Sequence, residues 1–129
     1  ESSAYRVLEA DYFKNAGPRE LAAALGAGYE DILIDFGVLE EGSTAEFLRC
    51  EKQFVVASFS EWQQENLREF AMEKERTGKK SWQYLAVFGS DETRKEFWRR
   101  FGILSRRIPF SADAFSVTEE CGIFFEKLV

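Results

Sequence analysis

Residues 28–37 read Gly28-Tyr-Glu-Asp-Ile-Leu-Ile-Asp35-Phe-Gly37. Within this stretch, the segment Asp31–Phe36 is nearly continuous in large apolar residues, and an acid lies near its end. Continuous apolar strands are typical of parallel sheets that are covered on both faces. Open α/β sheets bind their ligands at the carboxyl ends of such strands. The stretch therefore predicts a buried parallel strand that carries Asp35 at the ligand-binding edge, with Gly37 in the loop that follows.

Other apolar runs follow the same rhythm along the chain, and helix-capping signals separate them. The order of these elements alternates between strand and helix, which predicts an α/β three-layer sandwich with a mainly parallel sheet of about five strands. Residues 1–129 are expected to form a single domain. The further strands are expected at Tyr5–Glu9, Phe54–Ser58, Tyr84–Phe88 and Ser105–Ile108, and the helices at Arg19–Leu25, after Ser43, after Ser60, after Ser90 and at Thr118–Leu128.

Composition excludes several classes of function. The 129 residues contain no His, which removes His-based catalysis and His ligation of metals. The formal net charge of -6 argues against binding to nucleic acid through bulk charge. No apolar run approaches the roughly 20 residues of a membrane span. The two cysteines do not make a disulfide framework, so a reduced, cytoplasmic protein is expected.

The Asp31–Phe36 segment, with its following Gly37, resembles the Walker B strand of P-loop ATPases of the partition and septum-positioning (ParA/MinD) type. Phe54–Phe59 and Trp82–Gly89 resemble the next two strands of that family in order, and Thr118–Val129 resembles its closing helix. The pair Pro109-Phe110 resembles the turn that borders the nucleotide base in the family. The resemblance covers residues 17–129.

This resemblance implies a set of site residues. Asp35 would hold Mg²⁺, directly or through water, and Gly37 would lie in a switch loop at Phe36–Gly42. Pro109 and Phe110 would lie near the base. Mg-ATP would then be the cofactor of a longer parent protein.

The chain departs from the family where the phosphates would bind. The Gly-rich loop with its Lys is absent, and the single Gly-Lys pair, Gly78-Lys79, follows a long predicted helix. Backbone amides and a Lys are needed to hold the phosphates for phosphoryl transfer. The 129 residues are therefore expected to have no cofactor and no catalytic activity alone. The start, ESSAYRV, and the missing loop suggest a fragment of a longer ATPase, or a degenerate binding or regulatory module. A protein partner or a missing N-terminal half is expected.

Two other functions fit the same pattern. In a receiver-like signalling domain, Asp35 would be the phospho-acceptor, Glu9 and Asp11 would hold Mg²⁺, and Pro109-Phe110 would match a receiver turn. However, Ile108 occupies the position where receivers carry a Lys. The other alternative is a partner-docking scaffold.

Loss of the P-loop strand would leave an open sheet edge, which recruits other strands. Either Tyr5–Glu9 closes this gap, which we favour, or a second copy of the chain does. The basic cluster between Arg94 and Arg107 is interpreted as a solvated helix face, with a patch for an acidic partner as the alternative.

Overall fold

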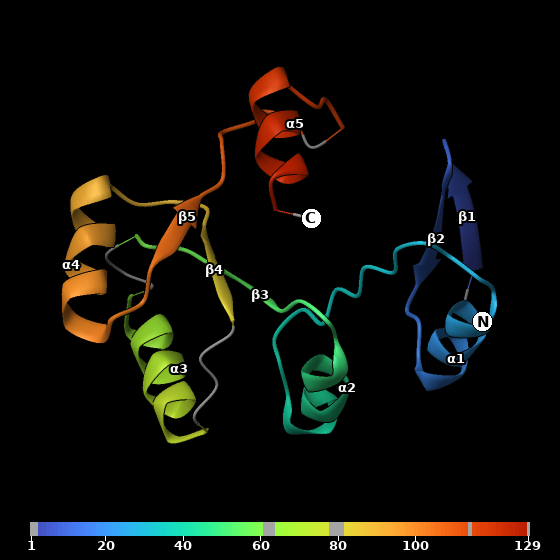
Figure 1. Cartoon of the computed structure of the whole chain (residues 1–129), viewed down its shortest axis with the longest axis horizontal. Helices are drawn as coiled ribbons and strands as arrows, with labels where there is room; N and C mark the ends of the chain where they lie inside the picture. Colours follow the sequence, from blue (N-terminus) through green and yellow to red (C-terminus); the bar gives the residue numbers. More distant parts are fainter. Residues whose placement is uncertain (1–2, 61–63, 78–81, 114, 129) are drawn as a thin grey trace. The chain divides into compact units, whose positions relative to one another are not determined.

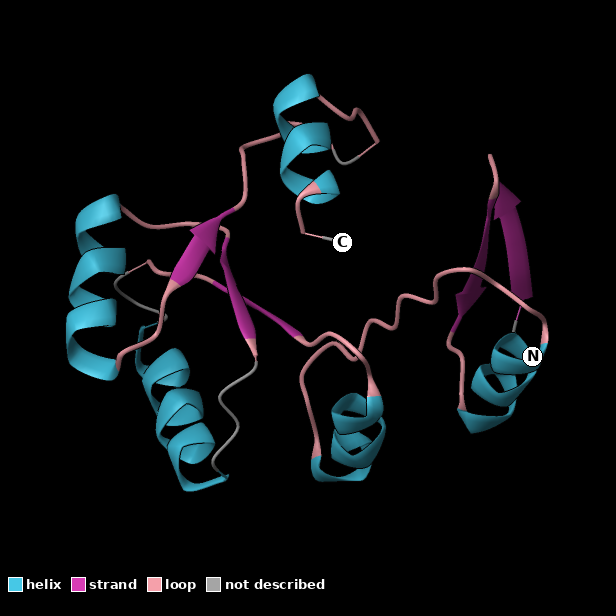
Figure 2. Ribbon diagram, viewed as in Figure 1, coloured by secondary structure: helices cyan, strands magenta, loops and turns pink. Residues whose placement is uncertain are grey.

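The computed structural model describes residues 3–60, 64–77, 82–113 and 115–128, and these have mixed α/β character (Figures 1 and 2). The described part contains five α-helices, a three-stranded parallel sheet and a two-stranded antiparallel hairpin. The chain divides into two compact units, Glu1–Glu40 and Glu41–Val129. Each unit is described by itself below.

The first unit is a β-hairpin followed by a helix. Strand β1 (Ser3–Val7) pairs antiparallel with β2 (Ala10–Lys14), and Val7 lies opposite Ala10 across a two-residue turn. Leu8 in that turn has a φ of 55°, a left-handed conformation that is unusual for a side chain of its size. Helix α1 (Pro18–Gly26) begins with proline, which is pre-organised for the first turn, and the Glu20 carboxylate accepts a 2.9 Å hydrogen bond from the backbone N–H of Gly17.

Two of the expected strands differ in this unit. Asp31–Phe36 forms no strand, and the Leu33 side chain within it is 89% exposed. The prediction was wrong because an apolar run specifies a strand only when another strand pairs with its backbone. The Tyr5–Glu9 run does form a strand over most of its length. However, its partner is the next segment of the chain, so the expectation that it pairs into the parallel sheet was also wrong.

The second unit contains the parallel sheet. A short 3-10 turn, Glu41–Ser43, leads into helix α2 (Thr44–Arg49). The sheet order then follows the chain as β3-β4-β5, and both pairs are parallel. Right-handed crossovers between neighbouring strands place the two connecting helices on the same face. The strands are β3 (Phe54–Ala57), β4 (Gln83–Ala86) and β5 (Ser105–Arg107), and the helices are α3 (Gln64–Thr77), α4 (Asp91–Phe101) and α5 (Glu119–Glu126).

The core of this unit lies between that face of the sheet and helices α3 and α4. Phe59, just after β3, is fully buried and meets the Phe97 ring of α4 edge to face, with 5.2 Å between the ring centroids. Such aromatic pairs add to the free energy gained by burying their area. The buried cluster comprises Phe59, Leu67, Tyr84, Ala86, Phe97 and Ile103.

The capping signals predicted most helix boundaries correctly. Ser90 precedes α4, and its hydroxyl accepts a hydrogen bond from the backbone N–H of Thr93, while Gly102 ends the helix in the left-handed conformation. The Thr118 hydroxyl caps α5 in the same way. Ser43 immediately precedes α2, but its side chain makes no capping hydrogen bond. The first residues after Ser60, where a second capping box was expected, lie outside the described residues.

Tyr84 should make this unit sensitive to alkaline pH. Burial raises the pKa of its hydroxyl well above the ordinary value of 10.0. As the pH rises, the Tyr84 hydroxyl loses its proton in the unfolded chain before it does so in the folded protein. Deprotonation therefore favours unfolding, and the free energy of unfolding, which is unaffected below about pH 10, falls as the pH rises above it. We expect the urea midpoint to fall between neutral pH and about pH 11, and to fall less for Tyr84→Phe. Equal losses in both proteins would contradict this assignment.

Candidate functional site

The carboxyl edge of the parallel sheet is the expected location of a site in this fold. Three connections leave the sheet there. Ser58 and Ser60 follow β3, and their hydroxyl oxygens lie 2.7 Å apart in a hydrogen bond. Ser90 and Asp91 follow β4, and Arg107 is the last residue of β5. Hydroxyl, carboxylate and guanidinium groups therefore lie at the ends of these three strands.

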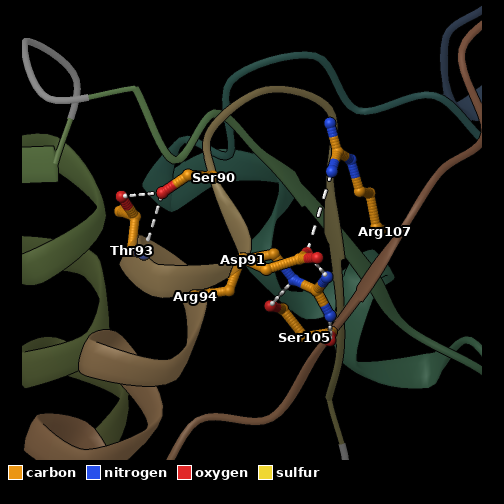
Figure 3. Close-up of polar contacts among 6 residues, drawn as sticks. All are labelled: Ser90, Asp91, Thr93, Arg94, Ser105 and Arg107. Atoms are coloured by element: carbon orange, nitrogen blue, oxygen red, sulfur yellow. Dashed lines mark hydrogen bonds and ion pairs between the residues drawn. The ribbon is translucent and has the colours of Figure 1, made fainter.

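A polar cluster joins the start of α4 to strand β5 (Figure 3). The Asp91 carboxylate lies 2.9 Å from the Arg94 guanidinium and 3.7 Å from that of Arg107. Arg94 also donates to Ser105 twice, at 2.7 Å to its carbonyl and at 3.3 Å to its hydroxyl. Most hydrogen-bonding groups of the cluster are therefore paired within it, and these contacts hold α4 against β5.

Two of these connections touch each other through their backbones. The N–H of Phe59 donates a 3.0 Å hydrogen bond to the carbonyl of Phe88. Gly89, the next residue, has a φ of +105°, and a Cβ placed on it would lie 2.6 Å from both the Cβ and the carbonyl oxygen of Phe59. Only glycine fits such an approach without a backbone shift. The loops after β3 and β4 are thus fixed relative to one another.

The resemblance implied that Asp35 would hold Mg²⁺ and that Gly37 would lie in the loop beside it. Both residues lie in the first unit and contact each other. The backbone N–H of Gly37 donates a 2.8 Å hydrogen bond to Asp35 Oδ1, and Gly37 has a φ of +59°. Asp side chains commonly accept a hydrogen bond in this way from the backbone N–H two residues later in a turn. Asp35 is exposed. It follows a segment without strand structure, so it does not stand at the carboxyl end of a strand as the sequence predicted.

Asp35→Asn should therefore change stability little. An exposed carboxylate with one local hydrogen bond is worth far less than a buried, paired charge, whose loss costs roughly 3–5 kcal/mol. Because the Asn side chain retains an oxygen that can accept from Gly37, we expect a loss below about 1 kcal/mol in urea unfolding. A loss above about 2 kcal/mol would make Asp35 a structural residue.

Pro109 and Phe110 begin a connection between β5 and α5, and we call its described residues, Pro109–Asp113 and Phe115–Val117, the aromatic loop. Its large apolar side chains are turned to solvent: Phe110 is 84% exposed, Phe115 97% and Val117 76%. Apolar residues scattered singly over a surface are normal, whereas exposed apolar residues that lie together mark interaction sites.

The aromatic loop is nonetheless ordered by its own hydrogen bonds. The Ser111 hydroxyl donates to the Asp113 carbonyl at 2.7 Å, and the Phe115 N–H donates to the Asp113 carboxylate at 2.9 Å. The Ser116 N–H also donates to the Asp113 carbonyl, at 3.2 Å. The loop is anchored to the sheet where the Ile108 N–H bonds to the Ala86 carbonyl. These hydrogen bonds fix the backbone that carries the exposed apolar side chains of the loop.

Sequence reasoning selected Pro109 and Phe110 but missed Phe115 and Val117. The available signal was the spacing of three large apolar residues within a stretch of Ser, Ala and Asp, where they fit neither a strand nor a helix period. The basic cluster is divided in the structure. Arg94 bonds to Ser105 and Arg106 donates to Gln83, whereas the rest of the α4 cations, Lys95, Arg99 and Arg100, are exposed.

Within the described residues, no group of three His, Cys, Asp or Glu side chains is placed to hold a metal ion. No helix in that part of the chain has the length and apolar content needed to cross a membrane. Comparisons with protein-family models, with curated proteins and with solved structures found no match to this chain.

Proposed function

We propose that the chain is a binding or regulatory module that docks a protein partner through its aromatic loop. The observation that carries this proposal is the combination of exposure and order at Phe110, Phe115 and Val117. Exposed aromatic side chains anchor protein interfaces. A loop that is already ordered loses less conformational entropy when a partner binds, which favours affinity.

The proposal includes the ATPase-like origin suggested by the sequence. A ParA/MinD-type domain without its phosphate-binding loop would keep the fold and lose the chemistry, leaving a binding module. The α/β character of the described residues is what this origin requires of the fold.

The proposal is tested with two variants that carry matched changes. Phe110→Ser combined with Phe115→Ser removes the loop's aromatic rings, whereas Phe125→Ser removes a 43% exposed ring from α5. Partners would be captured with the wild-type protein alone, identified and purified before either variant is measured. We expect calorimetry to show about 100-fold weaker binding for the loop variant and unchanged binding for Phe125→Ser. A partner that binds both variants equally would contradict a docking role for the loop.

A separate prediction concerns nucleotide. Because the sequence has no Gly-rich loop with a Lys, the 129 residues should not bind Mg-ATP with micromolar affinity. Calorimetric titration of the chain with Mg-ATP is expected to give only the heat of dilution. A clear micromolar isotherm would show that nucleotide is held by other residues and would contradict the proposed loss of function.

A further inference from the structure

The two edges of the parallel sheet differ in how their backbone groups are used. Directly after β5, the Ile108 N–H bonds to the Ala86 carbonyl of β4, so the alternation along the chain turns the Ser105 carbonyl outward. That carbonyl accepts the 2.7 Å hydrogen bond from Arg94. Charged side chains and covered backbone groups protect sheet edges from pairing. An arginine therefore covers the outward carbonyl of Ser105 on the β5 edge.

The β3 edge has no such protection among the described residues. The carbonyl of Gln53 accepts from Gln83 of β4, and that of Ala57 accepts from Val87, the residue after β4. This alternation turns the backbone groups of Phe54 and Val56 away from the sheet. Among the described residues of the second unit, no strand pairs with that side of β3. Val56 is also 60% exposed. An apolar strand thus presents its outer backbone donors and acceptors unpaired.

We propose that β3 is a self-association edge, at which a second copy of the chain adds its own β3 in antiparallel orientation. The two-fold axis would pass beside Val55. Phe54 of one copy would then lie opposite Val56 of the other, and the outward backbone groups of both residues would form hydrogen bonds in both strands. Aromatic and β-branched residues form favourable cross-strand pairs.

The charge pattern of the edge favours a second copy as the occupant. In a two-fold contact, the same strand of the two copies pairs, so a charged residue in that strand would lie near the identical residue of the other copy. The stretch Gln53–Ser60 contains no charged residue. In the proposed register the nearest charges, Glu51 and Lys52, would lie opposite Phe59 and Ser58 of the second copy. Self-pairing therefore brings no like charges face to face.

The edge is tested with two lysine variants that change the net charge equally. Val56→Lys places a charge on the β3 edge, and Leu104→Lys, at a residue that is 75% exposed before β5, is the control. Sedimentation equilibrium over a dilution series should show a dimer for the wild type and for Leu104→Lys. We expect Val56→Lys to raise the dissociation constant of the dimer at least about tenfold. A monomeric wild type, or a dimer that Val56→Lys leaves intact, would overturn the proposal.

Hydrogen exchange on the wild type gives an independent readout that does not depend on how the variants fold. The amides of Val55 and Ala57 face β4 and should be protected at every concentration. Those of Phe54 and Val56 should become protected only as the protein is concentrated. Protection of Phe54 and Val56 in a monomer, at all dilutions, would show that another strand of the same chain occupies the edge and would overturn self-association.

Discussion

Replacing Phe59 with alanine is expected to lower the free energy of unfolding by about 4 kcal/mol, because truncating a buried Phe costs roughly 3–5 kcal/mol. The ring is fully buried and packs edge to face on Phe97. Its removal would leave a cavity among the strands and helices that form the core. The loss should appear as a lower urea midpoint with an unchanged slope.

Phe88→Ala is the matched control for this variant. The Phe88 ring is 59% exposed, and its backbone carbonyl would still accept the hydrogen bond from Phe59. Truncation there is expected to cost less than about 1 kcal/mol. If both variants lost a similar small amount of stability, Phe59 would not be the centre of the core.

Gly89→Ala should have the second largest effect, a loss of about 2–4 kcal/mol. The substitution combines two costs. A φ of +105° is strained for any residue with a side chain, and the new Cβ would lie 2.6 Å from the Cβ and the carbonyl oxygen of Phe59. Because the carbonyl oxygen of Phe59 is a backbone atom, the loop itself has to move.

Gly102→Ala separates these two costs. Gly102 also has a positive φ, of +65°, but nothing lies within 4 Å of a Cβ placed on it. It should therefore show only the backbone strain, about 1 kcal/mol. Urea unfolding of both variants measures the difference. Equal losses would mean that contact between the loops at Gly89 contributes nothing to stability.

The parts of the fold that the sequence predicted well are those that local chemistry determines. Strands β3, β4 and β5 lie where their apolar runs predicted them, apart from one or two terminal residues. Helices α4 and α5 begin directly after Ser90 and Thr118, since a side-chain hydroxyl at these positions satisfies an otherwise unpaired backbone N–H. These signals act over a few residues, so one sequence is enough to detect them.

The errors concern strand partners, which local patterns do not encode. Asp31–Phe36 is rich in large apolar residues and nevertheless forms no strand. Tyr5–Glu9 pairs with Ala10–Lys14 through a turn that contains Leu8 and Glu9, without the Gly or Asn that usually marks a hairpin. Leu8 adopts the left-handed conformation there, against its intrinsic preference. No local rule predicts such a turn.

The candidate site shows the same division. The local contact between Asp35 and Gly37 follows from their spacing. The placement of Asp35 at a sheet edge required a strand that is not formed. The exposure of Phe115 and Val117 depends on how Ser111 and Asp113 shape the connection between β5 and α5. Hydrogen bonds of this kind involve several residues together, so they become visible only in three dimensions.

The arginine on the β5 edge also limits how large an assembly can become. A sheet with two open edges can add copies on both sides and grow into a filament. A sheet with one open edge forms a dimer through a single two-fold contact, and the dimer then has no open edge left. The Arg94 guanidinium donates a hydrogen bond to the outward carbonyl of Ser105. Under the proposed self-association, this contact removes one acceptor from the β5 edge and so disfavours growth of the sheet on that side.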